Sequence, residues 1–263
     1  MESPKTFGSD SIANLIRSYG VPYLPMTPGA SFRGLHDSIV NHLDNKDPEL
    51  LICIHEEHAV AVAHGYAKVT GEPLIVALHS NVGLMHAAMA IYNAWCDRVP
   101  MLIIGATGPL DAEKRRPWID WIHTSQDQGQ VIRPYCKWDD QPISPDAALN
   151  AISRGMSITK SLPRAPVYIN CDTILFEEEH EPSTEQLIDG TRDQTELPGL
   201  TEKQLERLKS AISTSKKIVI LLGRLNRNQN NFDNRIRLAE GLSATVITDL
   251  RTGSTFPTDH DLH

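Results

Sequence analysis

The chain has 263 residues, of which 40% are hydrophobic and 22% charged, with a formal net charge of −8 and a pI near 5.7. This composition is ordinary for a globular protein, and without a basic stripe it argues against a nucleic-acid-binding role. No apolar run reaches the ~20 residues of a membrane helix, and the opening MESPKTFGSD has no hydrophobic signal region. We therefore expect a cytoplasmic protein that binds neither nucleic acid nor membrane.

The cysteines are scattered along the chain, without a CxxC pair. Cys53 and Cys171 lie within apolar runs, which predicts buried free thiols rather than disulfides or a metal site.

The N-terminal two thirds alternate short apolar runs with helical patterns. Strands are expected at residues 21–24, 50–54, 74–78, 99–105 and 165–175, and helices at residues 11–19, 32–43, 84–95 and 146–161, with another helix ending before Gly71. Because the strands are nearly continuous apolar runs separated by helices, the pattern predicts an α/β fold, a parallel sheet with helices on both faces.

The most informative stretch is LICIHEEHAVAVAHGYAKVTG, residues 51–71. An apolar run gives way here to helical spacing, and Gly71 follows as a C-cap. Glu56 therefore lies where a buried strand passes into a helix, whereas Glu57 is expected to be solvated. A carboxylate in the first turn of a helix offsets the helix dipole, so a purely structural role for Glu56 stays open.

Two further loops follow expected strands. PMTPGAS comes after the first strand, and HSNVG, which begins at His79, comes after residues 74–78. Ligands collect at the carboxyl ends of parallel strands, which makes His79 a candidate site residue. A turn role for the first loop and a structural role for His79 are the alternatives.

Taken in order, these motifs resemble the pyrimidine-binding domain of thiamine-diphosphate-dependent enzymes, in the group of acetolactate synthase, benzoylformate decarboxylase and pyruvate decarboxylase. The resemblance covers about residues 9–173. It implies that Glu56 contacts the aminopyrimidine ring of the cofactor and favours the imino tautomer. That tautomer takes the proton from the thiazolium carbon and so leaves the ylid, the nucleophile that the cofactor supplies.

The resemblance also implies which residues surround the cofactor. Besides Glu56, it assigns cofactor-binding positions to Pro28, Gly29, Ser80 and Gly83. The turn that usually reads Ser-Gly-Pro-Gly in acetolactate-synthase-like members reads Ser-Asn-Val-Gly here, which is a departure from the family pattern.

For the substrate, the resemblance to benzoylformate decarboxylase implies a catalytic role for His79, whose counterpart faces the substrate. Aligned on the Pro-Gly pair, the serine of that enzyme falls on Ala30, which leaves Ser31 as a secondary candidate. Gln126, in the family's Gln-containing segment, is another secondary candidate. The implied substrate is a 2-oxo acid, which is either decarboxylated or joined to a second carbonyl.

Residues 109–138 contain Trp118, Trp121 and His123. These side chains could line a substrate entrance, or they could form a dimer surface, since tryptophan is enriched at interface cores. We favour the dimer surface for the tryptophans and add Trp95 to it.

The whole chain is expected to form two domains joined by a linker. Residues 1–175 form the expected pyrimidine-binding domain, and residues 176–200, with little apolar periodicity, are an expected extended and mobile linker. Residues 201–263 begin with Thr201 as an N-cap and resemble the start of the family's central domain, an incomplete Rossmann-like unit. The turn at Gly223 lacks the GxGxxG spacing of dinucleotide-binding proteins.

In the family, a third domain binds the diphosphate and Mg²⁺ through a Gly-Asp-Gly motif that this sequence lacks. We therefore expect thiamine diphosphate and Mg²⁺ to be cofactors of a complete or partnered form, with no metal site in this chain. The chain by itself should be inactive. Its expected partners are further copies, in a homodimer or tetramer, or a complementary subunit with the diphosphate site. The alternative is a non-catalytic regulatory or interaction protein of the same fold.

Overall fold

The computed structural model describes residues 5–181, 199–226 and 228–263. The chain forms two compact units, Met1–Gln194 and Thr195–His263, which we describe separately. Among the described residues, no helix combines the length and the apolar character needed to cross a bilayer.

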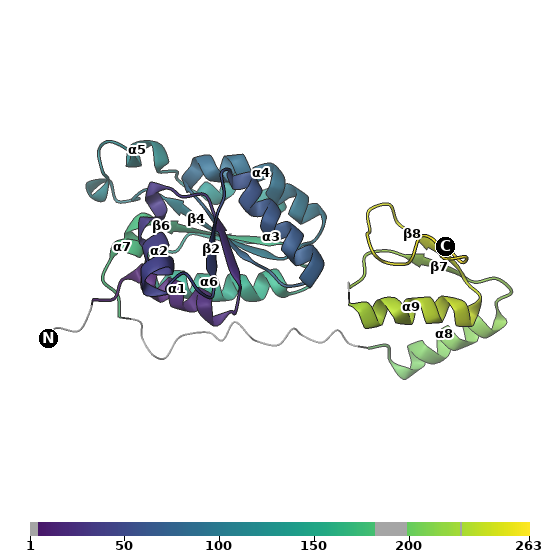
Figure 1. The fold of residues 1–263 in the computed structure, drawn as a ribbon. Coiled ribbons are helices and arrows are strands. Elements are labelled where there is room, and N and C mark those ends of the chain that lie inside the picture. The colour runs from purple at the N-terminus through teal and green to yellow at the C-terminus, as the bar shows by residue number, and fades with distance from the viewer. Residues whose placement is uncertain (1–4, 182–198, 227) are drawn as a thin grey trace. The chain divides into compact units, whose positions relative to one another are not determined.

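The first unit is built on a six-stranded sheet in which every pair of neighbouring strands is parallel, in the order β2-β1-β3-β4-β6-β5 (Figure 1). Its strands are β1 (Tyr23–Met26), β2 (Glu49–Ile52), β3 (Ile75–Leu78), β4 (Met101–Thr107), β5 (Trp138–Asp140) and β6 (Pro166–Asp172). β3 and β4 are buried along their whole length, as the continuous apolar runs predicted.

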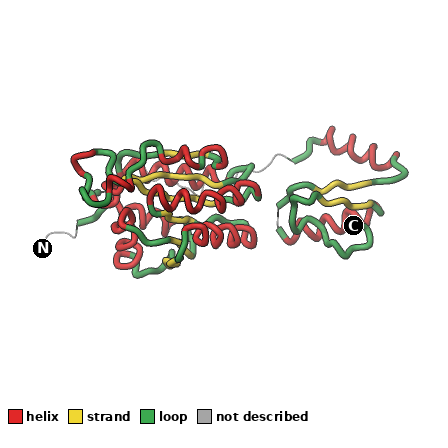
Figure 2. The backbone as a smooth tube through the Cα atoms, turned by 90° about the horizontal axis from the view of Figure 1, so that it is seen from above, coloured by secondary structure: helices red, strands yellow, loops and turns green. Residues whose placement is uncertain are grey.

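Helices cover this sheet (Figure 2). They are α1 (Gly8–Ser18), α2 (Arg33–Asp37), α3 (Glu56–Thr70), α4 (Ser80–Cys96), α5 (Asp120–His123), α6 (Pro145–Lys160) and α7 (Thr173–Glu177). α3 packs against α4 over β3 and β4, whereas α1 packs against α2 and α6. The predicted α/β architecture is confirmed, including Gly71 as the C-cap of α3 with a φ of 81°.

Several boundaries differ from those expected. α4 begins at Ser80 instead of residue 84, because His79 already occupies the N-cap position. The expected helix 32–43 is divided into a 3-10 turn, α2 and a π turn. The expected strand 165–175 ends at Asp172, whose side chain caps α7 by accepting from the Ile174 N–H at 3.0 Å.

The first unit also extends further than the expected boundary at residue 175. Phe176 is 1% exposed and packs against Phe32, with ring centroids 5.8 Å apart. His180 Nδ1 lies 3.0 Å from the Ser11 hydroxyl, which attaches the following residues to α1. The prediction that the linker starts at Phe176 is therefore wrong. The remainder of that expected linker, residues 182–198, lies outside the described residues.

The second unit contains α8 (Glu202–Thr214), β7 (Val219–Leu222), α9 (Gln229–Leu242) and β8 (Thr245–Thr248), with β7 and β8 parallel. Thr201 caps α8 as predicted, in a reciprocal capping box with Gln204. Its buried core is small and consists of Leu222, Ala239, Val246 and Phe256.

The four cysteines are free. Cys171 is buried in β6, as predicted, and burial raises the pKa of its thiol to about 12. Cys53 is only half-buried, so the prediction that its thiol is buried is wrong.

Candidate functional site

Glu56 is the first residue of α3, close after the carboxyl end of β2, and its side chain is 8% exposed. His55 occupies the N-cap and accepts the Glu57 N–H at Nδ1, 3.2 Å away. The strand-to-helix switch read from the sequence thus places a nearly buried carboxylate at the positive end of a helix, where negative charge is favoured.

The two oxygens of Glu56 differ in their surroundings. Oε2 lies 3.1 Å from His86 Nδ1, and within the described part of the chain Oε1 has no protein donor. Gly83 lies directly against the carboxylate, because a Cβ built there would be 3.0 Å from Glu56 Cγ and 3.1 Å from Oε1. Glu56 and Gly83, which the sequence assigned to one cofactor site, are therefore neighbours.

His79 and Gly29 meet in the same way. A Cβ on Gly29 would lie 2.0 Å from His79 Cγ, so only glycine fits beside this ring. Ser31 Oγ is 2.6 Å from His79 Nδ1. The structure thus brings together the sequence candidates His79, Gly29 and Ser31.

The pKa of His79 is lowered to about 4, because burial disfavours its charged form, and His123 adds to this effect while Glu56 opposes it. The His79 ring contacts the edge of the His123 ring, with centroids 4.7 Å apart and planes at 87°. At neutral pH this imidazole is uncharged and can both donate and accept a hydrogen bond.

His123 is held in place by the short helix α5 and its flanking loop. The Gly108 N–H donates to the His123 carbonyl at 3.0 Å, and the Asn81 amide donates to the Ile122 carbonyl at 3.1 Å. Trp118 and Trp121, on the same segment, are 67% and 69% exposed. They present aromatic surface to solvent, as both the entrance and the dimer hypotheses require.

The remaining candidates are less closely connected. Ser80 is fully buried in a left-handed conformation with a φ of 48°, and its hydroxyl donates to Asn81 Oδ1. Such strain is costly for a residue other than glycine and is concentrated at functional sites. Pro28 is exposed in the loop after β1. Gln126 is exposed in a turn, whereas Gln128 is buried and donates to the Tyr168 hydroxyl at 2.7 Å.

Sequence reasoning missed two groups. His86 lies three residues after Gly83 on α4, a spacing that puts both on one helix face and could have pointed to it. Thr27 Oγ1 is buried without a hydrogen-bond partner in the described structure. No pattern in the sequence signals that orphan hydroxyl.

These groups suit a flat, nitrogen-rich ring. A nearly buried carboxylate offers one oxygen that no protein group uses among the residues that the structure describes, and a glycine leaves space beside it. A carboxylate can accept a hydrogen bond from a protonated ring nitrogen.

Comparison with known proteins is consistent with a site for such a ring. Residues 7–131 match the family described as "Thiamine pyrophosphate enzyme, N-terminal TPP binding domain". The chain is 26% identical over 267 aligned residues to the acetolactate synthase large subunit of Lactococcus lactis, covering 100% of this chain and 44% of that protein. It is 25% identical over 216 residues to benzoylformate decarboxylase of Pseudomonas aeruginosa, covering 82% and 40%.

Among solved structures, the thiamine diphosphate-dependent 4-hydroxybenzoylformate decarboxylase of Rhodococcus jostii RHA1 has the same fold. The TM-score is 0.79 at 20% identity, over 92% of this chain and 44% of that one. Residues 7–131 thus match that family's N-terminal domain, and the first unit has the fold of this decarboxylase. The chain spans less than half the length of these relatives.

Proposed function

We propose that the first unit holds the aminopyrimidine ring of thiamine diphosphate through Glu56, in an enzyme that decarboxylates a 2-oxo acid or joins it to another carbonyl compound. The observation that carries this proposal is the nearly buried Glu56 carboxylate, with one oxygen beside His86 and the other without a protein donor among the described residues. The relatives named above support the reaction class, since they are an acetolactate synthase, a benzoylformate decarboxylase and a 4-hydroxybenzoylformate decarboxylase.

When bound, thiamine diphosphate supplies a carbon nucleophile. In our proposal, Glu56 Oε1 accepts a hydrogen bond from a ring nitrogen, while the contact of Oε2 with His86 fixes the carboxylate plane. Gly83 keeps the space beside Oε1 open.

His79 would face the substrate. With its pKa lowered to about 4, it is neutral at pH 7. If the Ser31 hydroxyl donates to Nδ1, the ring proton lies on Nε2, which can then donate to a substrate oxygen. Ser31 thus becomes a positioning residue for His79, a larger role than the sequence gave it.

We further propose that the diphosphate and Mg²⁺ are held by groups other than those around Glu56, on a partner or a further segment. Mg²⁺ requires several oxygen ligands, and the cluster at Glu56 offers one carboxylate and two imidazoles. Calorimetric titration of this chain alone with thiamine diphosphate and Mg²⁺ should show no micromolar binding and no decarboxylation. Micromolar binding without a partner would contradict this part of the proposal.

Glu56→Gln tests the central role, in the chain assembled with the component that supplies diphosphate binding. Deuterium exchange at the thiazolium carbon of the bound cofactor should slow by about a hundredfold or more, the scale of general acid–base catalysis. The matched control is Glu57→Gln, the exposed neighbour on the same helix turn, which should exchange normally. Equal rates in both variants would remove Glu56 from the mechanism and favour a non-catalytic protein of this fold.

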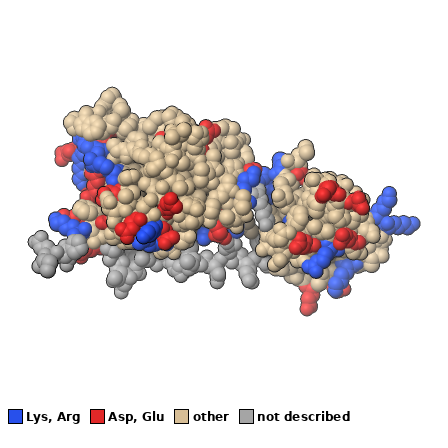
Figure 3. All heavy atoms as spheres, viewed as in Figure 1, with Lys and Arg blue, Asp and Glu red and all other residues tan. Residues whose placement is uncertain are grey.

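We also propose that the first unit associates with a second copy through α4. Val82, Met85, Met89 and Tyr92 recur at helical spacing and are 36%, 55%, 58% and 45% exposed. In Figure 3, few charged side chains lie over the part of the first unit where Figure 1 places α4. An apolar stripe of this kind marks an interaction surface.

Sedimentation velocity tests this surface. Met89→Glu should shift the chain toward monomer, whereas Leu162→Glu should not, because Leu162 is 60% exposed in the loop after α6 and is not part of the α4 stripe. If Met89→Glu associates as the parent does, the α4 stripe is not the surface through which the copies associate.

A further inference from the structure

In the proposed function His55 has no role, and His86 only orients the Glu56 carboxylate. His55, Glu56 and His86 each offer a ligand atom, and these atoms lie within 4.8 Å of one another. We propose that this cluster is a binding site for a divalent transition-metal ion, with Zn²⁺ as the ion that its ligands suit best.

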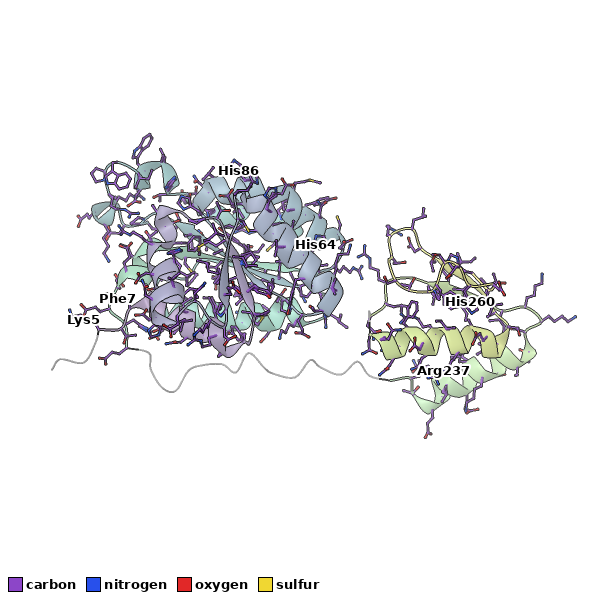
Figure 4. All side chains as sticks on the ribbon, viewed as in Figure 1. Lys5, Phe7, His64, His86, Arg237 and His260 are labelled. Carbon is purple, nitrogen blue, oxygen red and sulfur yellow. The ribbon has the colours of Figure 1, made fainter. Side chains whose placement is uncertain are left out.

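Packing of α3 against α4 creates the cluster. His55 and Glu56 come from the first turn of α3, and His86 projects from α4 with half of its side chain exposed (Figure 4). The two imidazoles are stacked, with centroids 4.9 Å apart and planes at 20°. His86 Nδ1 and Glu56 Oε2 are already 3.1 Å apart, which is close to the spacing of two ligands on one tetrahedral ion.

The third ligand needs only a small adjustment. In a tetrahedral zinc site with bonds near ~2.0 Å, ligand atoms are about 3.3 Å apart, so the cluster must contract from at most 4.8 Å. The His86 ring is half-exposed and can rotate. An ion bound to His55 Nδ1 would replace the hydrogen bond from the Glu57 N–H, which is exposed and can donate to water instead, whereas an ion bound to Nε2 would leave that bond in place.

The donor set selects the kind of metal. Two imidazoles and one carboxylate with an open fourth position suit Zn²⁺, Ni²⁺ or Cu²⁺. Mg²⁺ and Ca²⁺ prefer oxygen ligands, of which the cluster has one carboxylate, so they should bind far more weakly.

A metal at this position would have a functional effect, and this step rests on the proposed function. An ion on Glu56 Oε2 offsets the negative charge of the carboxylate, and this weakens the hydrogen bond that Oε1 can accept from the aminopyrimidine ring. Metal and cofactor would then weaken each other's binding, and free zinc would inhibit the enzyme.

The metal site is tested on the chain without any cofactor. Co²⁺ is the spectroscopic probe, because a tetrahedral site gives intense visible absorption, and calorimetry with Zn²⁺ gives stoichiometry and affinity. We expect one ion per chain. His86→Ala and His55→Ala should each weaken Zn²⁺ binding by more than about tenfold. Substitution of residues that only hydrogen-bond to a metal ligand already causes losses of that size. Circular dichroism should show that both variants keep the fold.

The control is His42→Ala, an exposed histidine on the π turn that follows α2, which should bind as the parent does. Absence of one-to-one binding would overturn the proposal, and so would equal affinities in His86→Ala, His55→Ala and His42→Ala. Because no cofactor is present, these outcomes do not depend on Glu56 binding the pyrimidine. That role is tested separately by deuterium exchange in Glu56→Gln.

Discussion

Gly83 gives the Glu56 carboxylate its space. Alanine at this position would place a methyl group 3.0 Å from Glu56 Cγ, closer than nearly all real contacts of this kind. Its neighbour Gly65, in the middle of α3, has nothing within 4 Å of the equivalent Cβ. Alanine at Gly83 therefore changes both the packing against Glu56 and the helix propensity, whereas alanine at Gly65 changes the helix propensity alone.

Gly83→Ala should displace the carboxylate and slow cofactor deuterium exchange by roughly tenfold or more, since about 1.4 kcal/mol corresponds to tenfold. Gly65→Ala should leave exchange unchanged and stabilise the protein by about 0.5–1 kcal/mol, the usual gain of alanine over glycine in a helix. Urea unfolding and the exchange rate measure the two effects. Normal exchange in Gly83→Ala would show that the contact is not needed.

His79 should make stability depend on pH. Its pKa falls from an ordinary 6.5 to about 4 on folding, mainly because of burial, so the unfolded chain binds the proton more tightly. Above pH 6.5 His79 is neutral in both states and does not lower the free energy of unfolding. As the pH falls from 6.5 toward 4, the unfolded chain takes up a proton that the folded chain does not, and the free energy of unfolding decreases. For a half-buried ring screened by solvent, we expect a loss of roughly 1–2 kcal/mol.

The measurement is urea unfolding followed by tryptophan fluorescence at pH 7 and pH 5, in the parent and in His79→Gln. The variant should lose less stability than the parent between these pH values. Identical pH dependence in the two proteins would contradict the lowered pKa of His79.

At the residue scale, the sequence predicted Glu56 well because its signal is local: an apolar run ends and helical spacing begins beside it. The pairs Ser31–His79 and Glu56–His86 were not predictable, because their members are 48 and 30 residues apart in sequence. Such contacts follow from how helices pack on the sheet, which periodicity does not reveal. The roles in cofactor and substrate binding stay predictions.

Among the elements, the apolar strands and most amphipathic helices were predicted with boundaries off by a few residues, whereas the divided helix at residues 32–43 and the short irregular elements were not predicted. β5 is three residues long, with the sequence Trp-Asp-Asp, and forms an edge of the sheet, so it has neither the length nor the apolar character of a predicted strand. α5 has only four residues and is held in place by an ion pair rather than by a helical pattern.

That ion pair joins Arg116 to Asp120. Asp120 is 1% exposed and accepts from the Arg116 backbone N–H at 2.8 Å, from Nε at 3.0 Å and from Nη2 at 2.8 Å. The guanidinium holds the pKa of Asp120 below its usual value. Because α5 carries His123, this pair indirectly positions the ring that contacts His79.

Asp120→Ala should cost roughly 2–3 kcal/mol, since it removes charge-assisted hydrogen bonds and leaves the cation without its partner. It should also raise the pKa of His79, measured by NMR titration, because His123 would no longer be fixed against it. Asp127→Asn is the control: Asp127 pairs with Arg133 at the surface, where such pairs contribute at most about 1 kcal/mol. An unchanged pKa of His79 in Asp120→Ala would show that the ion pair of α5 does not affect the environment of His79.

At the scale of the molecule, the two units should unfold separately. Among the described residues of the second unit, the hydrophobic core cluster has four buried members, while Leu221, Val219 and Leu208 remain 72%, 59% and 47% exposed. So small a core supports little stability by itself. All four tryptophans of the chain, Trp95, Trp118, Trp121 and Trp138, lie in the first unit, so tryptophan fluorescence reports on the first unit alone, whereas circular dichroism reports on both.

In urea, circular dichroism should therefore show an early loss of signal that tryptophan fluorescence does not follow. Phe256→Ala should move only this early phase, because Phe256 is 4% exposed in the second core and truncation of a buried phenylalanine costs about 3–5 kcal/mol. Coincident transitions by both probes would mean that the two units unfold as one.

The strand order also determines how the first unit can reach its native state. Neighbouring strands are parallel throughout, so no hairpin can form early and every pairing must wait for a crossover segment. The edge strand β5 pairs with β6 only after the whole of α6 has been made. Contacts so distant in sequence require a large loss of chain entropy to close the loop before any favourable interaction forms, and this slows folding. During synthesis, the apolar β3 and β4 would leave the ribosome well before β6, the second neighbour of β4, and this interval is when the chain is most exposed to aggregation.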